Sequence, residues 1–136
     1  MIISVLAAFA WTGCSDDPVD DDGLLITSRR ECYVGSFNLL GVDRQTVVSG
    51  GNPFGADKQN PHIDTTACTI DVQVFYGTDL KNLYPQFSLV TDAKLEPKVE
   101  GLTDFSDLAN PRKYTVISGN REVRKEYTIR IVVQQP

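Results

Sequence analysis

The residue types that usually carry out catalysis are sparse in this sequence and poorly placed for it. The 136 residues include a single histidine, His62, with no recognisable nucleophile motif near it. The chain has no Gly-x-Ser-x-Gly elbow, no zinc-binding His-Glu-x-x-His and no phosphate-binding glycine-rich loop. Asp104 and Asp107 could form the carboxylate pair that hydrolyses a glycosidic bond, but Asp104-Phe105-Ser106 is more typical of a structural turn. We therefore expect no catalytic residues, no metal site and no cofactor in a protein that is not an enzyme.

The three cysteines are the remaining candidates for covalent chemistry: Cys14, Cys32 and Cys68. In an exported domain Cys32 and Cys68 could form a disulfide, which would close a loop of about 36 residues and contribute up to roughly 3–4 kcal/mol. Alternatively, Cys68 lies on the apolar face of a predicted strand, where a reduced cysteine behaves as a small hydrophobic residue. The sequence leaves both alternatives open.

Cys14 ends an N-terminal segment that has the features of an export signal. Residues 1–13 are uncharged, and the apolar stretch 2–11 is far shorter than the roughly 20 residues that span a bilayer as a helix. The junction Trp11-Thr12-Gly13-Cys14 resembles a bacterial lipobox, which implies removal of residues 1–13 and attachment of lipid to Cys14. Trp11 departs from the lipobox pattern, and no Lys or Arg precedes the apolar stretch. The alternative is a buried N-terminal strand with an ordinary core cysteine.

The stretch after Cys14 is acidic, with aspartates at positions 16, 17, 20, 21 and 22. Such charge density predicts an unfolded tether over residues 14–23, and residues 14–22 are expected to make few contacts with the domain that follows. The stretch also resembles the export signal of Bacteroidetes surface lipoproteins. That resemblance assigns the signal to Asp16 and Asp17, and it implies display on the extracellular side of the outer membrane. An EF-hand calcium loop does not fit, because Pro18 would take the first ligand position and Arg29 the last.

The net charge of −5 belongs to this acidic stretch. Without its five aspartates, 13 acidic residues remain against 13 basic residues. A nucleic-acid-binding domain would carry an excess of basic residues, so no nucleic-acid partner is expected.

Beyond the acidic stretch, short strand-like runs alternate with turn residues, and no amphipathic helix of ten or more residues is evident. The clearest run is Cys68–Tyr76, whose apolar and polar residues alternate as they do in a strand with one buried face. The runs 112–117 and 123–133 predict a hairpin in which Gly119 and Asn120 supply positive φ at a tight turn. Weaker runs predict further strands at 24–26, 32–40, 46–48, 87–90 and 94–99, the last at a sheet edge because it contains Pro97. About seven strands within residues 24–136 predict one all-β domain, an antiparallel β-sandwich.

The apolar faces of these strands predict the core. Eight residues are expected between the two sheets: Ile70, Val72, Val74, Tyr114, Val116, Tyr127, Ile129 and Ile131.

A spread pattern over residues 62–133 carries a family resemblance. Its elements are Ile63-Asp64, Ile70-x-Val72-x-Val74, Gly77-Thr78-Asp79-Leu80, Asp104-Phe105-Ser106, Tyr114-Thr115-Val116 and Tyr127-Thr128-Ile129. The pattern resembles the immunoglobulin-like domains of Bacteroidetes surface lipoproteins, which often belong to glycan-uptake systems. This resemblance implies an immunoglobulin-like sandwich and a non-catalytic spacer or protein-interaction module at the cell surface. The alternative it implies is an accessory glycan-binding lipoprotein of a polysaccharide-uptake system.

Partners of such a module would be the outer-membrane lipid, through Cys14, and a glycan or a neighbouring surface protein. The long connection from Ser49 to Pro61 is the expected ligand-binding surface, because long loops usually have a functional reason. The candidate ligand residues in and beside it are Phe54, Asp57, Lys58 and His62. Exposed tyrosines could also serve as platforms for a sugar: Tyr33, Tyr76 and Tyr84.

Overall fold

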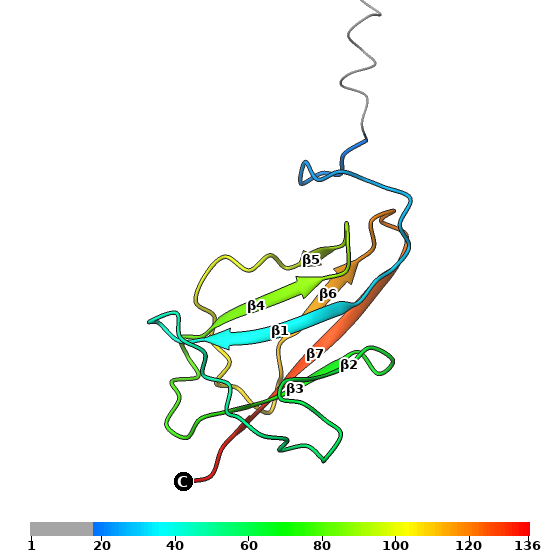
Figure 1. Ribbon diagram of the computed structural model, residues 1–136. Coiled ribbons are helices and arrows are strands. Elements are labelled where there is room, and N and C mark those ends of the chain that lie inside the picture. Colours follow the sequence, from blue (N-terminus) through cyan, green and yellow to red (C-terminus); the bar gives the residue numbers. More distant parts are fainter. Residues whose placement is uncertain (1–17) are drawn as a thin grey trace, which may run out of the picture.

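The computed structural model describes residues 18–136, which form seven strands in two sheets (Figure 1). The apolar segment 1–13, Cys14, Asp16 and Asp17 lie outside the described residues. The strands are β1 (Val34–Leu40), β2 (His62–Asp64), β3 (Thr69–Val74), β4 (Tyr84–Leu89), β5 (Lys94–Glu96), β6 (Lys113–Ile117) and β7 (Arg124–Val133). Residues 18–136 contain no helix, and thus no helix with the length and apolar character needed to cross a membrane.

The two sheets differ in size. β1 pairs with β4 alone, and the other five strands form a sheet in the order β2-β3-β7-β6-β5. The sheets enclose one hydrophobic core, which confirms the predicted all-β sandwich. One pairing departs from the antiparallel expectation, because β3 and β7 run parallel with Val72 opposite Ile131. The alternation of apolar and polar residues shows which side chains share a face. It does not show the direction of the neighbouring strand, because a strand buries the same face beside a parallel or an antiparallel neighbour.

Most predicted strands are present, but those predicted at 24–26 and 46–48 form only isolated bridges, and one observed strand was not predicted. β5 stops before Pro97 and lies at the edge of its sheet, as the proline predicted. β2, at His62–Asp64, was not predicted, since three residues are too few to show an alternating pattern. The predicted strand 46–48 instead makes isolated bridges, one to Leu40 in the small sheet and one to Val74 in the large sheet. This segment therefore crosses from one sheet to the other.

The core has the predicted composition. All eight residues named from the strand faces are buried, with at most 9% of their surface exposed. An aromatic row joins the sheets: the ring of Phe87 on β4 lies 4.8 Å from Phe37 on β1 and 4.9 Å from Tyr114 on β6, measured between centroids. The backbone N–H of Val34 also donates to the Tyr127 hydroxyl at 3.4 Å. The two sheets are thus joined by specific contacts as well as by apolar burial.

In the turn between β6 and β7, the residue with positive φ is not one of the two that were predicted. Positive φ occurs at Arg121 (63°), and neither Gly119 nor Asn120 has it. Gly119 is needed for close approach: a β-carbon there would collide with the hydroxyl oxygen of Thr27 and lie 2.9 Å from the β-carbon of Asp92. The glycine was correctly placed in the turn, but its role depends on a segment that lies far away in the sequence.

Both cysteines within the described part of the chain are free thiols, so the disulfide considered above is absent from the structure. The buried Cys32 thiol donates to the carbonyl of Val116 at 3.1 Å, and Cys68 donates to the carbonyl of Thr65 at 3.7 Å. Burial raises the pKa of the Cys32 thiol, which keeps it in the neutral, hydrogen-bonded form. Cys32 therefore behaves as a small hydrophobic residue of the core, and Cys68, for which this role was expected, is partly buried and packs against the core.

Candidate functional site

The residues before β1 form a short folded segment, residues 18–27, which we call the N-terminal strap. Val19 bridges Leu25, and the amide of Ile26 donates to the carbonyl of Pro18 at 2.8 Å. Inside this turn one carboxylate oxygen of Asp20 accepts from the amides of residues 22 and 24, at 3.0 and 2.9 Å. The strap is therefore organised around the side chain of Asp20, as an aspartate often organises a turn.

Ion pairs hold the strap to the domain. The second carboxylate oxygen of Asp20 lies 2.7 Å from the Nζ atom of Lys94 and 2.9 Å from Nε of Arg121, and Asp22 lies 2.8 Å from the same lysine nitrogen. The side chains of Asp20, Lys94 and Arg121 are only 10%, 12% and 14% exposed. The prediction that residues up to 22 make few contacts is therefore wrong for Asp20 and Asp22. The charge run looked unfolded because its cationic partners lie elsewhere in the sequence.

The ion pairs shift the pKa values of all three groups, Asp20, Asp22 and Lys94. The hydrogen bond from Lys94 holds the pKa of Asp20 well below its usual range, and the same lysine lowers the pKa of Asp22. Its hydrogen bond to Asp20 in turn raises the pKa of Lys94. All three groups are thus charged across the neutral pH range.

Further hydrogen bonds, accepted by backbone carbonyls, extend the attachment to the β6–β7 turn. Arg121 donates to the carbonyl of Leu25 at 3.0 Å, and the amide of Thr27 donates to the carbonyl of Gly119 at 2.9 Å. This turn leads directly into β7, a strand of ten residues that runs toward the C-terminal residues. Figure 1 accordingly shows the strap at one end of the sandwich and the C-terminus at the other. The chain enters the domain at one end and leaves it at the opposite end.

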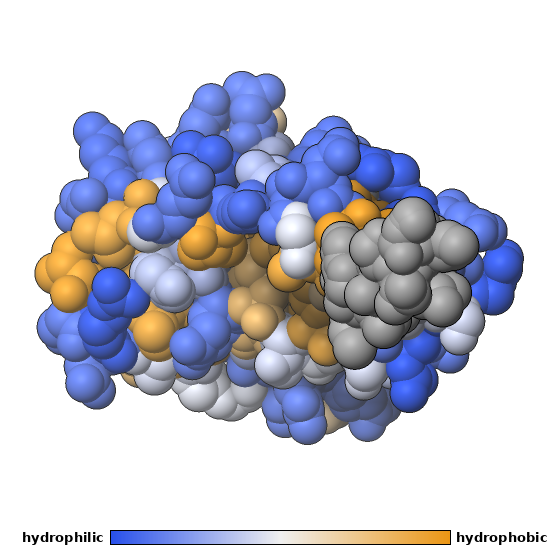
Figure 2. All heavy atoms as spheres, turned by 90° about the horizontal axis from the view of Figure 1, so that it is seen from above, coloured by the Kyte–Doolittle hydropathy of each residue, from blue (hydrophilic) through white to orange (hydrophobic). Residues whose placement is uncertain are grey.

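Seen from the strap end, hydrophobic patches interrupt the hydrophilic surface (Figure 2). On the strap itself Val19, Leu24 and Leu25 are 56%, 45% and 50% exposed. Leu24 also lines an apolar groove of about 460 Å³ between β4 and β5, together with Leu89, Leu95 and Val99.

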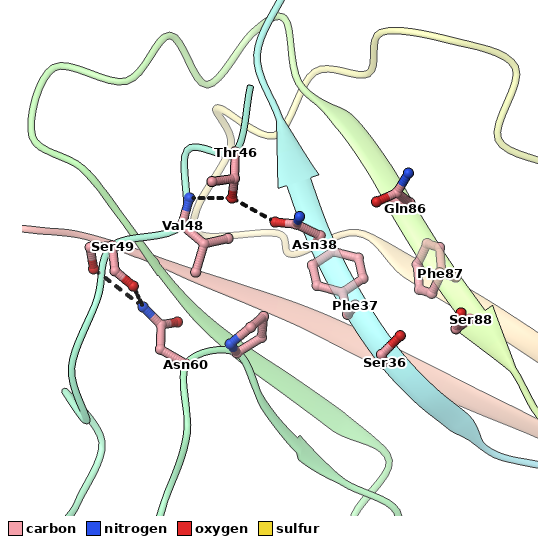
Figure 3. A pocket seen from close by; sticks show the side chains of 11 residues that line it. Ser36, Phe37, Asn38, Thr46, Val48, Ser49, Asn60, Gln86, Phe87 and Ser88 are labelled. Atoms are coloured by element: carbon pink, nitrogen blue, oxygen red, sulfur yellow. Dashed lines mark hydrogen bonds between the residues drawn. The ribbon is translucent and has the colours of Figure 1, made fainter. Parts of the chain in front are cut away.

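A second, polar groove of about 500 Å³ lies beside β1 (Figure 3). Its floor is the outer face of the small sheet, where Ser36 of β1 pairs with Ser88 of β4 and Asn38 pairs with Gln86. Its wall is the crossing segment near Ser49 together with the end of the following loop. The remaining lining residues are Phe37, Thr46, Val48, Asn60, Pro61 and Phe87. We call this cavity the β1–β4 groove.

The wall of the β1–β4 groove is fixed by hydrogen bonds. The Asn60 amide nitrogen donates to the Ser49 carbonyl at 2.7 Å and to the Gln73 carbonyl at 3.0 Å, while the Asn60 amide oxygen accepts from the Gln73 backbone at 2.9 Å. On the floor, the amide oxygen of Asn38 accepts from the hydroxyl of Thr46 at 2.7 Å and from the amide of Leu39 at 2.9 Å. The groove is therefore built on rigid elements.

Other polar groups of the floor are free. Among residues 18–136, the side chains of Ser36, Gln86 and Ser88 and the Nδ2 group of Asn38 have no intramolecular hydrogen-bond partner. None of the eleven lining residues is charged, although 23% of the residues in the chain are.

The residues predicted to bind a ligand lie elsewhere. None of Phe54, Asp57, Lys58 and His62 lines the β1–β4 groove, and His62 instead pairs with Asp71 in the sheet. Ligand binding by these four residues remains a prediction. The groove residues were overlooked, although neutral polar residues at alternate positions of β1 and β4 provided a signal for them.

The predicted tyrosine platforms differ in how accessible their rings are. Tyr33 and Tyr76 are 41% and 65% exposed, whereas the ring of Tyr84 is covered by the guanidinium of Arg44, 4.4 Å from its centroid. Tyr76 follows the end of β3, and Tyr84 begins β4.

The two aspartates considered for hydrolysis have structural partners. Asp104 accepts from the backbone and the hydroxyl of Ser106 at 2.8 and 2.6 Å, and Asp107 accepts from the side chain of Asn110 at 3.1 Å. The hydroxyl hydrogen bond of Ser106 lowers the pKa of Asp104, whereas a general acid needs a raised pKa. Within residues 18–136, no group of three or more His, Cys, Asp or Glu side chains is arranged to hold a metal ion.

Comparison with known proteins places the chain in a family. Residues 53–131, more than half of the chain, match the family described as "SGBP, N-terminal", and the chain belongs to this family. Its members are N-terminal domains of glycan-binding proteins. No curated protein matches the chain.

Two crystal structures show similar folds. One is a putative glycoside hydrolase from Bacteroides thetaiotaomicron, with a TM-score of 0.55 and 25% identity over 78% of this chain and 26% of that one. The other is a DUF4623 family protein from Bacteroides eggerthii, with a TM-score of 0.52 and 20% identity over 78% of this chain and 22% of that one. The chain thus spans about a quarter of the length of each protein. The family match and these structures confirm the resemblance to domains of Bacteroidetes surface glycan-binding lipoproteins.

Proposed function

We propose that this chain is a non-catalytic spacer module of a glycan-handling lipoprotein, anchored through Cys14 and displayed on the extracellular side of the outer membrane. In this role it separates a neighbouring part of the surface machinery from the membrane by the length of a folded domain.

The observation that carries the proposal is the position of the strap relative to the C-terminus. Asp20 is fixed by Lys94 and Arg121 at one end of the sandwich, only a few residues after Cys14. From this end β7 runs ten residues, about 33 Å, toward the other end. A folded domain keeps the strap and the end of β7 at a fixed separation, which a flexible linker cannot do.

The proposal of a non-catalytic role rests on the two aspartates considered for hydrolysis, Asp104 and Asp107. The hydrogen bonds of Asp104 and Asp107 belong to exposed turns, and the lowered pKa of Asp104 disfavours a role as general acid. Neither aspartate lines the β1–β4 groove. The family match to N-terminal domains of glycan-binding proteins supports the same view.

Domain replacement in the full reading frame tests the spacer role. An unrelated β-sandwich of similar length, with its termini at opposite ends, replaces residues 24–133, and growth of the cells on the relevant polysaccharide is measured. We expect growth with the replacement and a loss of growth when residues 24–133 are deleted or replaced by a flexible Gly-Ser linker. If only the native domain supports growth, a specific interaction surface is required and the spacer proposal fails.

A further inference from the structure

We propose that the open edge of β4 binds an extended segment of another protein as an added β-strand, whose apolar side chains enter the groove between β4 and β5. The residues that line this groove include Leu24, Leu89, Leu95 and Val99, and we call it the β4–β5 groove. The proposal does not depend on the spacer role, because a folded domain separates two parts of a protein with or without a strand bound at its edge.

β4 has one edge that pairs with β1 and one edge that is open. Neighbouring residues of an antiparallel strand direct their backbone groups to opposite edges. Just before β4, Leu83 exchanges two hydrogen bonds with Thr103 on the side away from β1, at 3.1 and 2.7 Å. Just after β4, the amide of Val90 donates to the carbonyl of Tyr33, on the side of β1, at 3.1 Å. The odd-numbered residues of β4 therefore direct their backbone groups to the open edge.

The open edge carries the C=O groups of Pro85, Phe87 and Leu89 and the N–H groups of the last two, since proline has no N–H. Among residues 18–136 these groups have no hydrogen-bond partner. Such a row of free donors and acceptors is a template for another strand. An α-helix would not pair with it, because the backbone groups of a helix are already bonded within the helix. The main chain of the expected occupant is therefore extended.

The β4–β5 groove lies beside the open edge and gives the added strand apolar surface to cover. Its volume is about 460 Å³, and the side chains of Leu89, Leu95 and Val99 are only partly buried and pack against the core. The segment 97–103 leaves β5 and rejoins the β4 edge only at Thr103 (Figure 1). Alternate side chains of a strand share one face, so apolar residues at alternate positions of the added strand would enter the groove.

The charges at the groove favour an acidic residue in the added strand. Two lysines, Lys94 and Lys98, and one aspartate, Asp22, are among the lining residues. Lys94 is held between Asp20 and Asp22 and is 12% exposed, whereas Lys98 is 63% exposed and lies 3.9 Å from Asp22. A carboxylate extending from the added strand would find the ammonium group of Lys98 accessible. The expected partner thus has apolar residues at alternate positions and an acidic residue beside them.

A second copy of the chain fits the open edge less well than a different protein. Two β4 edges related by a two-fold axis would pair antiparallel, which places the two straps at opposite ends of the dimer. With the anchor proposed above, the two lipid groups would then point away from each other and could not enter one membrane. Pro85 would also leave a C=O group of the opposing strand without a donor.

Titration followed by two-dimensional NMR tests the open edge. The secreted form of the chain carrying Cys14→Ser is mixed with six acetylated peptides of eight residues. Valine, leucine or isoleucine occupies alternate positions, threonine occupies the positions between them, and both ends carry either aspartate or lysine. We expect at least one aspartate peptide to shift the backbone amides of Phe87 and Leu89 in a saturable manner and to slow their hydrogen exchange. Its lysine counterpart should bind about two- to fivefold more weakly.

N-methylation of the peptide separates main-chain pairing from apolar contact alone. Two isomers of the bound peptide carry methyl groups on alternate backbone nitrogens, one isomer on the apolar residues and the other on the threonines. In an added strand the N–H groups of only one of these sets face β4. One isomer should therefore lose binding, and the other should keep it.

Charge reversal on the protein tests the placement beside Lys98. Lys98→Glu changes an exposed side chain, so the fold should persist while the preference changes from aspartate peptides to lysine peptides. Lys113→Glu, at an exposed lysine of β6 outside the groove lining, should leave the preference unchanged. Sedimentation velocity of the peptide-free chain should show a monomer.

Several outcomes would overturn the proposal. They are the absence of shifts at Phe87 and Leu89 with all six peptides, equal behaviour of the two N-methylated isomers, and an unchanged preference in Lys98→Glu. A peptide-free dimer in which these two amides exchange slowly would assign the open edge to a second copy of the chain instead.

Discussion

The carboxylate of Asp20 and the ammonium group of Lys94 lie 2.7 Å apart, although one belongs to the acidic N-terminal stretch and the other begins β5. Arg121 completes the arrangement from the β6–β7 turn. Three distant parts of the sequence are therefore joined at one end of the sandwich. A stretch with the composition of a flexible tether is in part a structural element of the domain.

The first prediction concerns this ion cluster. Asp20→Asn keeps the size of the side chain but leaves Lys94 and Arg121 with less negative charge around them, so the melting temperature should fall and amides 19–27 should exchange faster. Asp21→Asn is the matched control, because Asp21 is exposed and outside the cluster. Equal effects of the two changes, by calorimetry and hydrogen exchange, would show that the strap is not held by Asp20.

The second prediction is a pH dependence of stability. Asp20 and Asp22 have lowered pKa values in the folded chain, so their stabilising effect is complete above their unfolded pKa of about 3.9 and is lost as the pH falls further. Lys94 has a raised pKa, so its effect is complete below about pH 10.4 and is lost as the pH rises through its folded pKa. Melting curves should show a plateau between these limits. A double Asp20→Asn, Asp22→Asn variant should have a lower plateau and a smaller decline in acid, and an unchanged acid limb would contradict this assignment.

The third prediction tests the faces of the sheets. Val72 is fully buried, so Val72→Asp would place an unpaired carboxylate in the core, and the domain should unfold. Val132→Asp is the control, because Val132 is 45% exposed on the neighbouring strand and should change stability by less than about 1 kcal/mol. Circular dichroism with urea unfolding measures both. Gln73 is a poorer control, because its side-chain oxygen accepts from Ser49 at 2.7 Å.

The fourth prediction concerns the close contact at Gly119. Gly119→Ala inserts a methyl group against Thr27 and Asp92 and should destabilise the domain by about 1–3 kcal/mol. Gly50→Ala should be nearly neutral, since nothing lies within 4 Å of a β-carbon there. Adding Thr27→Ala to the Gly119→Ala variant should restore part of the loss in urea unfolding. A Gly119→Ala protein as stable as the parent would refute the steric explanation.

The fifth prediction concerns the anchor, which precedes the described residues. Cys14→Ser should abolish incorporation of labelled fatty acid and move the protein to the aqueous phase of a detergent separation, because a diacylglyceryl thioether provides the two chains needed for stable membrane attachment. The melting temperature of the domain should not change. Replacing Asp16 and Asp17 with Ala should instead reduce surface display, measured by protease treatment of intact cells, without releasing the protein from the membrane. Absence of label on the parent chain would disprove the lipidation proposal.

The sequence could predict those features that depend on near neighbours. Alternation in Cys68–Tyr76 and Val123–Val133 assigned the buried faces of β3 and β7, because successive side chains of a strand point to opposite sides whatever the strand pairs with. Pro97 indicated an edge strand for an equally local reason, since it has no N–H to donate to a neighbour.

Only the tertiary structure decided how distant segments combine. The parallel pairing of β3 with β7, the steric need for glycine at position 119 and the salt bridges of Asp20 all depend on residues far apart in the chain. The same is true of the β1–β4 groove, where Asn38 meets Gln86 across two strands. A local pattern shows which side chains a strand presents, whereas the partner they meet depends on the free energy of the whole packed domain, and no single segment contains that information.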